Sequence, residues 1–241
     1  MASSPSFLAP TAFIDSDHPR VIAFAREACG DASNDKERAT RLFRAVRDRF
    51  RYDPYTVSLE RDAYRASAIL DRDRGFCITK AIALCAAARA VGIPARLGFA
   101  DVRNHLASEK LLQVMRSNVF AFHGYVELWI GSPAFGGGGE ERRALKACPA
   151  FNAELCARFG VAPLEFDGEH DAMLQAFDGQ GRKYMEYLKD RGLYVDFPFD
   201  EVMRAFAEIY GGRLGGAGTV EVSNGAPLLD LEDVVDEVFQ G

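Results

Sequence analysis

The sequence predicts an α+β fold, in which helices come first and antiparallel strands follow. Apolar residues recur at helical spacing over 78–91 and stop at Gly92 and Pro94, which predicts a largely buried helix. The stretch 119–130 alternates in the manner of a strand. Residues 143–149 are expected to be its return strand, so that the two strands form an antiparallel hairpin.

Further elements are predicted on both sides of this core. The expected helices are 16–30, 34–50, a short one within 106–116, 152–159, 181–191 and 198–210, with a strand over 93–100. Asn34 followed by Glu37 has the spacing of a capping box. Residues 1–15 are expected to form an irregular lead-in, and the polar stretch 51–74 an ordered loop.

Length and composition limit the classes of protein. The 241 residues suit one large domain, which we place at 1–210, followed by a glycine-rich break and an acidic tail at 211–241. A formal net charge of −6 without a basic stripe argues against a nucleic-acid partner. The glycine run 136–139 is expected to be a hairpin tip, because no Lys-Ser/Thr pair of a phosphate loop follows it.

The cysteines, the N-terminal segment and the lengths of the apolar runs indicate where in the cell the protein is expected to lie. Five cysteines without a CxxC pair indicate neither a zinc site nor a disulfide framework, so a reducing cytoplasm is the expected location. The start of the chain lacks the pattern of a secretory signal. No apolar run approaches the roughly 20 residues that span a bilayer, so no membrane partner is expected. No cofactor or metal is predicted, and the oligomeric state is left open.

Cys77 stands at the start of the apolar helix, two residues after Gly75. A thiol in that position faces unpaired backbone N–H groups and the positive end of the helix dipole, both of which stabilise a nucleophilic thiolate. Gly75 is expected to adopt backbone angles that a side chain would forbid. The alternative is that Cys77 is a small buried core residue.

A nucleophilic thiolate needs a base, and the chain has four histidines. His123 lies within the apolar strand, where an imidazole must find a hydrogen-bond partner. A satisfied core histidine is the alternative for this residue. His18 and His170 are expected at the surface, and His105, next to Asn104, is either a cap or a site residue.

Three motifs, taken in order, resemble the transglutaminase-like superfamily. They are Gly-Phe-Cys at 75–77, Gly-Ile-Pro-Ala-Arg at 92–96 and His-Gly-Tyr-Val-Glu-Leu at 123–128, within a match of about residues 65–152. The resemblance implies a papain-like α+β fold, with a nucleophile helix packed on an antiparallel sheet and extra helices at both ends. It also implies that Cys77 is the nucleophile and His123 the general base and acid, joined as a thiolate–imidazolium pair.

This sequence departs from the family pattern at the third catalytic residue, the one that orients the histidine. The family's Asp-Pro-Thr aligns with Cys-Pro-Ala at 148–150, so Cys148 takes the place of the orienting aspartate. A thiol is a weak acceptor for an imidazole N–H. Asn152 is either an orienting amide or only a helix N-cap. Other candidates for the third member are Asp101, Asn104 and Asp167.

An acyl-transfer site also needs donors for an oxyanion. The N–H of Cys77 is the first expected donor, and the loop 52–64 is expected to supply a second, for example from Tyr52 or Tyr64. Arg96 and Glu127 are motif positions that a structural contact between them explains as well as a function does.

These observations predict cysteine-dependent acyl transfer on amide bonds, through an acyl-enzyme that is released to water (protease or amidase) or to an amine (transamidase). The expected substrate is a peptide or protein amide. The first alternative is a catalytically weak or inactive module of the same fold that binds a peptide or partner, which the altered aspartate position favours. The second is a redox-sensing protein, which the extra cysteines Cys85, Cys148 and Cys156 suggest.

Overall fold

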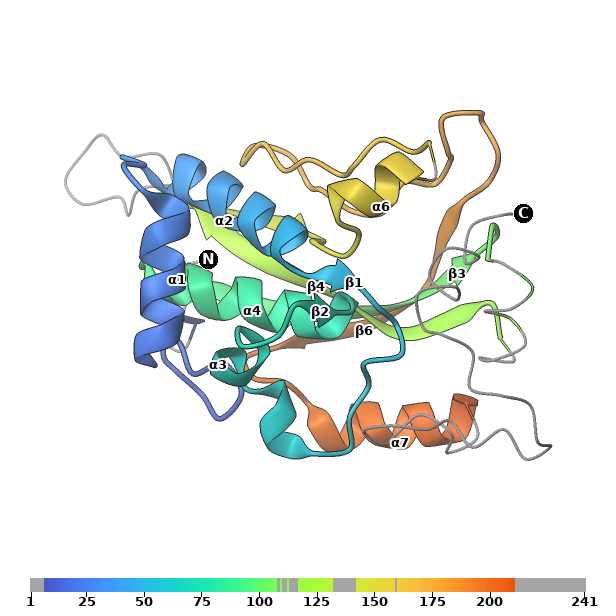
Figure 1. Ribbon diagram of the computed structural model, residues 1–241, viewed down its shortest axis with the longest axis horizontal. Coiled ribbons are helices and arrows are strands. Elements are labelled where there is room, and N and C mark those ends of the chain that lie inside the picture. The colour runs from blue at the N-terminus through green and yellow to red at the C-terminus, as the bar shows by residue number, and fades with distance from the viewer. Residues whose placement is uncertain are drawn as a thin grey trace.

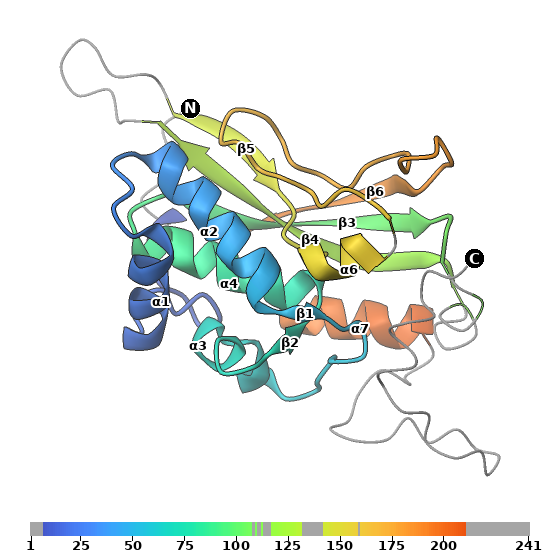
Figure 2. The ribbon, with the colours of Figure 1, turned by 45° about the horizontal axis from the view of Figure 1, so that its top comes forward.

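The computed structural model describes residues 7–107, 109, 112, 117–131, 142–158 and 160–210. Its centre is a four-stranded antiparallel sheet in the order β5-β4-β3-β6. The strands are β3 (Ala95–Asn104), β4 (Val119–Ile130), β5 (Arg143–Ala147) and β6 (Met185–Tyr194). Helix α4 (Cys77–Ala90) packs on β3 and β4, and α1 (Pro19–Cys29) and α2 (Asp35–Arg49) pack on α4 (Figures 1 and 2). This is the predicted α+β architecture, with the cysteine helix against an antiparallel sheet.

Helix α4 is the buried centre of the helical layer. Every residue from Cys77 to Arg89 is buried, in agreement with the apolar sequence. The side chain of Thr79 accepts a hydrogen bond from the N–H of Phe76 at 3.0 Å and so caps the first turn. The helix ends before Gly92, which has a φ of 84°. Both ends therefore lie where the sequence predicts them.

Gly75 serves a different purpose from the one predicted. It lies in the short strand β2 (Arg74–Gly75), which pairs in parallel with β1 (Arg51–Tyr52), and its φ is not in the left-handed region. A Cβ on Gly75 would lie 2.8 Å from Oγ1 of Thr79, the atom that caps α4. The expectation that Gly75 adopts backbone angles forbidden to other residues was therefore wrong. The glycine instead leaves space for the Thr79 side chain that caps α4.

Most predicted elements are confirmed, with α6 at Ala153–Arg158 and α7 at Phe199–Tyr210. The side chain of Asn34 caps α2 (Asp35–Arg49) by accepting a hydrogen bond from the N–H of Glu37. The carboxylate of Glu37 accepts from the N–H of Ser33, whereas a capping box would have it accept from the N–H of Asn34. The expected loop 51–74 also holds a 3-10 turn (Arg61–Tyr64) and α3 (Ala66–Ile69). None of the described helices is long and apolar enough to cross a lipid bilayer.

Several predictions fall on residues outside the described ranges. They are the short helix within 106–116, of which only parts are described, the glycine run 136–139 and the tail 211–241. The division of the chain into a domain at 1–210 and a tail stays a prediction.

Strand β6 contradicts the helix predicted over 181–191. The local sequence favours a helix, because it is rich in long unbranched side chains. In the structure, β6 pairs with β3 from Leu97↔Tyr194 to Asn104↔Met185. The backbone groups on that edge of β3 are satisfied by β6, a tertiary gain that local propensity does not contain.

The pairing of β3 with β4 generates a stability prediction at Gly98. Gly98 pairs with Tyr125, and a Cβ on Gly98 would lie 2.3 Å from atoms of the tyrosine ring. We expect Gly98→Ala to lower the free energy of unfolding in urea by about 1–3 kcal/mol. Gly179→Ala is the control, because no atom lies within 4 Å of that position, and it should stay within about 0.5 kcal/mol of wild type. Equal effects of the two substitutions would contradict the ring packing.

Candidate active site

Strand β4 crosses the N-terminus of α4 at the residue after His123. A Cβ on Gly124 would lie 3.1 Å from the carbonyl oxygen of Cys77 and 3.1 Å from the Cα of Ile78. The absence of a side chain lets the strand approach the first turn of the helix this closely. Cys77 is 7% exposed and His123 3% exposed. The residues predicted as nucleophile and base are therefore carried by two elements that meet at this crossing, and the described hydrogen bonds do not join their side chains.

Burial controls the charge state of this pair. It raises the pKa of the Cys77 thiol to about 11, and the N–H groups of Gly124 and Ile78 offset it only in part. Burial also lowers the pKa of His123 to about 4. At neutral pH the resting pair is therefore a thiol and a neutral imidazole. Desolvation thus opposes the predicted thiolate–imidazolium pair in spite of the helix N-terminus, and that pair stays a prediction.

Cys148 contacts the imidazole directly. Its Sγ lies 3.1 Å from Nε2 of His123, and its S–H faces the carbonyl of Gly124 at 3.8 Å. Burial raises the pKa of Cys148 to about 12, so that it is a thiol at neutral pH. With the S–H directed at a carbonyl, the sulfur lone pairs face Nε2, which fits an Nε2–H tautomer. This tautomer leaves the Nδ1 lone pair of His123 available to take a proton.

The described side-chain hydrogen bond of Asn152 is made neither with His123 nor with the first turn of α6. Its Oδ1 accepts a hydrogen bond from the N–H of Tyr52 at 3.0 Å, and the residue is 6% exposed. The N–H of Ala153, at the start of α6, donates to Asp48. Asn152 thus ties β1 to the start of α6, and a role in orienting His123 stays a prediction.

The other candidates for the third member have partners of their own. Asp101 accepts from Arg191 and from the N–H of Phe122. Asn104 accepts from the N–H of Leu106. His105, left open as a cap or a site residue, pairs with Glu186 at the surface. Their described hydrogen bonds do not include the ring of His123.

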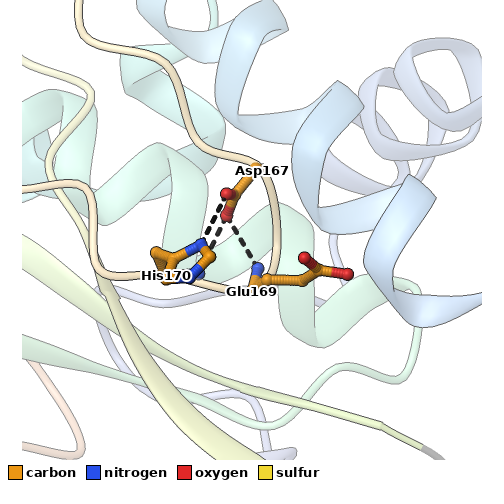
Figure 3. A group of neighbouring side chains, drawn as sticks. All are labelled: Asp167, Glu169 and His170. Atoms are coloured by element: carbon orange, nitrogen blue, oxygen red, sulfur yellow. Dashed lines mark hydrogen bonds and ion pairs between the residues drawn. The ribbon is translucent and has the colours of Figure 1, made fainter.

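Asp167 belongs to an exposed loop with Glu169 and His170 (Figure 3). One ligand atom from each of the three side chains lies within 4.8 Å of the others. Asp167 binds Nδ1 of His170 at 2.8 Å and also accepts the N–H groups of Glu169 and His170. Glu169 pairs with Lys36. The described contacts of Asp167 are thus made within this loop, and His170 is at the surface as predicted.

Lys80 is a buried charged group that the sequence analysis missed. It lies three residues after Cys77 on α4, and its Nζ donates to the carbonyls of Arg47 at 2.8 Å and Phe50 at 3.1 Å. Burial lowers the pKa of Lys80 to about 7, and its charged form would lower the pKa of both Cys77 and Cys148. A lysine inside an otherwise apolar helix was the available signal, since a buried amine must find acceptors.

The residues predicted as oxyanion donors differ in which of their N–H and O–H groups already have hydrogen-bond partners. The N–H of Tyr52 donates to Oδ1 of Asn152, which leaves the Tyr52 hydroxyl as the donor of that residue. The hydroxyl of Tyr64 accepts from the N–H of Ser58 at 3.3 Å. That hydroxyl still has its own proton to donate, so the N–H of Cys77 and the hydroxyls of Tyr52 and Tyr64 all stay predicted donors.

A small cavity of about 20 Å³ borders Cys148, with room for about one water molecule. Its lining includes Cys156, Leu174 and Tyr184. A space of this size holds no peptide.

A protein-family model matches part of this chain. Residues 22–138 match the model of the transglutaminase-like superfamily. The chain therefore contains a transglutaminase-like domain, as its motifs predict. This match supports a cysteine-based hydrolase or transferase in general and leaves the reaction open. No match was found among the curated proteins.

One similar solved structure is a crystal structure of a "putative cysteine protease" from Cytophaga hutchinsonii. The two chains are 15% identical and superpose with a TM-score of 0.41. The match covers 76% of this chain and 62% of the other, so this chain spans less than two thirds of that protein. A likeness of this size carries no conclusion about activity.

The buried imidazole generates a prediction about stability and pH. Because the pKa of His123 is about 4 in the folded protein and about 6.5 in an unfolded chain, only the unfolded state gains a proton between these values. Stability should therefore fall as the pH drops from about 6.5 to about 4. Over that range the wild type should lose about 3 kcal/mol more than His123→Leu, measured by urea unfolding. Parallel pH curves for the two proteins would contradict a neutral buried His123.

Proposed function

We propose that this protein is a cysteine-dependent acyl-transfer enzyme that acts on amide bonds of peptides or proteins. The observation that carries this proposal is the crossing of β4 over the N-terminus of α4 at Gly124, next to His123. The contact between Cys148 and Nε2 of His123 supports it further, because it leaves the other ring nitrogen for the Cys77 proton. The transglutaminase-like domain agrees with this class of chemistry.

In the proposed first step, the Cys77 sulfur attacks the amide carbonyl carbon as its proton passes to Nδ1 of His123. Proton transfer accompanies attack, because both groups are neutral at rest. The N–H of Cys77 stabilises the oxyanion. The intermediate collapses when His123 gives its proton to the leaving nitrogen, which leaves a thioester on Cys77.

In the proposed second step, water or an amine attacks the thioester, and His123 takes the proton of the acceptor. Its return to the Cys77 sulfur restores the resting thiol and imidazole. Water gives a carboxylic acid, so the net reaction is amide hydrolysis. An amine gives a new amide, so the net reaction is transamidation. Both outcomes use the same first half-reaction.

The second candidate is a catalytically weak or inactive domain that binds a peptide or partner. The specific observation in its favour is Cys148, a thiol of high pKa at the position of the orienting aspartate. A thiol stabilises an imidazolium less than a carboxylate does. Loss of the aspartate from a catalytic triad can cost about four orders of magnitude in rate.

An activity screen separates the two candidates. Wild type, Cys77→Ala and Cys85→Ala are incubated with a peptide-amide library, with and without an added primary amine, and the products are identified by mass spectrometry. Cys85 is the matched control, because it is a buried cysteine on the same helix. We expect Cys77→Ala to lose at least about 1,000-fold in rate and Cys85→Ala to keep its rate within a few-fold. Product formation that survives in Cys77→Ala would refute Cys77 as the nucleophile, and substrate binding without turnover in wild type would favour the second candidate.

Replacement of Cys148 tests its orienting role. Cys148→Asp would offer a carboxylate to Nε2–H and stabilise the imidazolium, so we expect kcat/KM near neutral pH to rise by about 10- to 100-fold. Cys148→Ser is the control, because it keeps a neutral side chain of similar size, and its rate should stay within a few-fold of wild type. Complete loss of activity in both variants would indicate instead that Cys148 is the nucleophile.

A further inference from the structure

Phe122, immediately before His123, has a backbone conformation that bulky residues avoid. Its φ is 53°, and among the described residues it alone combines a side chain with a positive φ. It is also fully buried. Such a conformation persists only where neighbouring groups hold it in place. Since the next residue carries the proposed base, the groups that hold Phe122 also set the direction of the imidazole.

Asp101 binds the backbone of Phe122 at an irregularity in the sheet. Ala100 pairs with His123, but Val102 pairs with Phe120, so two residues of β4 lie opposite Asp101 alone. This is the arrangement of a β-bulge, in which ladder hydrogen bonds are disrupted. Oδ1 of Asp101 accepts the N–H of Phe122 at 3.2 Å. The carboxylate thus supplies an acceptor at the bulge.

Arg191 holds Asp101 from the other side. Its Nε lies 2.9 Å from Oδ1 of Asp101 and its Nη2 lies 2.7 Å from Oδ2, which makes a bidentate pair. The guanidinium carbon also lies 4.8 Å from the centre of the Phe122 ring. Arg191 therefore fixes both the carboxylate that binds Phe122 and the ring of Phe122 itself.

We propose that Asp101 and Arg191 are positioning residues, which hold the strained backbone of Phe122 and thereby aim His123. They act through Phe122, because the Asp101 carboxylate binds its N–H, the Arg191 guanidinium packs on its ring, and the two side chains bind each other. This inference rests on the proposed function, since the direction of the imidazole matters only if His123 takes the Cys77 proton. It also gives β6 a part in the site, because that strand carries Arg191.

A purely structural ion pair is the alternative, and Arg96 provides the matched control. Its Nε lies 2.7 Å from Oε1 of Glu127, and its guanidinium carbon lies 5.0 Å from the centre of the Phe7 ring. Arg96 of β3 thus binds a carboxylate on the neighbouring strand β4 and packs on an aromatic ring, as Arg191 does, without a described contact to Phe122. A loss of sheet stability should appear in both arginine variants. A change in the position of His123 should appear only in the Arg191 variant.

The experiment measures the rate constant of Cys77 alkylation by iodoacetamide, mapped by mass spectrometry, from about pH 6 to pH 9. The proteins are wild type, Arg191→Gln, Arg96→Gln and His123→Ala, with urea unfolding of each as the measure of stability. We expect Arg191→Gln to lower the rate near neutral pH by about 10- to 100-fold, toward that of His123→Ala. Its pH profile should shift to alkaline values, and Arg96→Gln should stay within about twofold of wild type.

Asp101→Asn is the second variant, in case Arg191→Gln does not fold. This variant keeps the shape of the side chain and an acceptor for the N–H of Phe122, but it loses the negative charge that pairs with Arg191. Its rate of Cys77 alkylation should therefore lie between those of wild type and His123→Ala. A fast Cys77 in wild type with equal rates in Arg191→Gln, Asp101→Asn and Arg96→Gln would overturn this inference alone. A wild-type Cys77 that reacts no faster than in His123→Ala would overturn the proposed function, and this inference with it.

Discussion

The close approach of β4 to the first turn of α4 is the constraint on which the site depends. Gly124 permits it, because any side chain there would press on the backbone of Cys77 and Ile78. Helix α4 is buried along its length, and β4 is paired on both sides by β3 and β5. The first turn of the helix and the strand residue His123 are therefore held by the core of the domain rather than by a surface loop, which favours a precise site.

Electrostatics in this crossing is dominated by burial. A helix N-terminus favours a thiolate, yet the pKa of Cys77 is raised because its thiol is removed from water. The same effect keeps His123 neutral and leaves Cys148 protonated. The buried amine of Lys80 is the positive group nearest in sequence on this helix, and its charge would oppose these shifts for both thiols. In the proposed mechanism, charge separation therefore accompanies the bond-making step.

Local sequence signals predicted much of the fold, because α4 and β4 carry strong periodicities and clear ends. They also drew attention to Cys77, His123 and Cys148. They failed at β6, where the free edge of β3 decides the conformation, and they misjudged Gly75, whose role is to leave space for Thr79. The strain at Phe122 and its link to Arg191 depend on a bulge and on contacts 90 residues apart in sequence, which no local pattern contains.

The central claim is that Cys77, and not the thiol that touches His123, forms the covalent intermediate. Brief reaction of the wild type with para-nitrophenyl acetate, followed by acid quenching and peptide mapping by mass spectrometry, tests this claim directly. The account predicts an acetyl group on Cys77 that is absent or much reduced in His123→Ala. An acetyl group on Cys148, or an equal low level on all five cysteines, would contradict it.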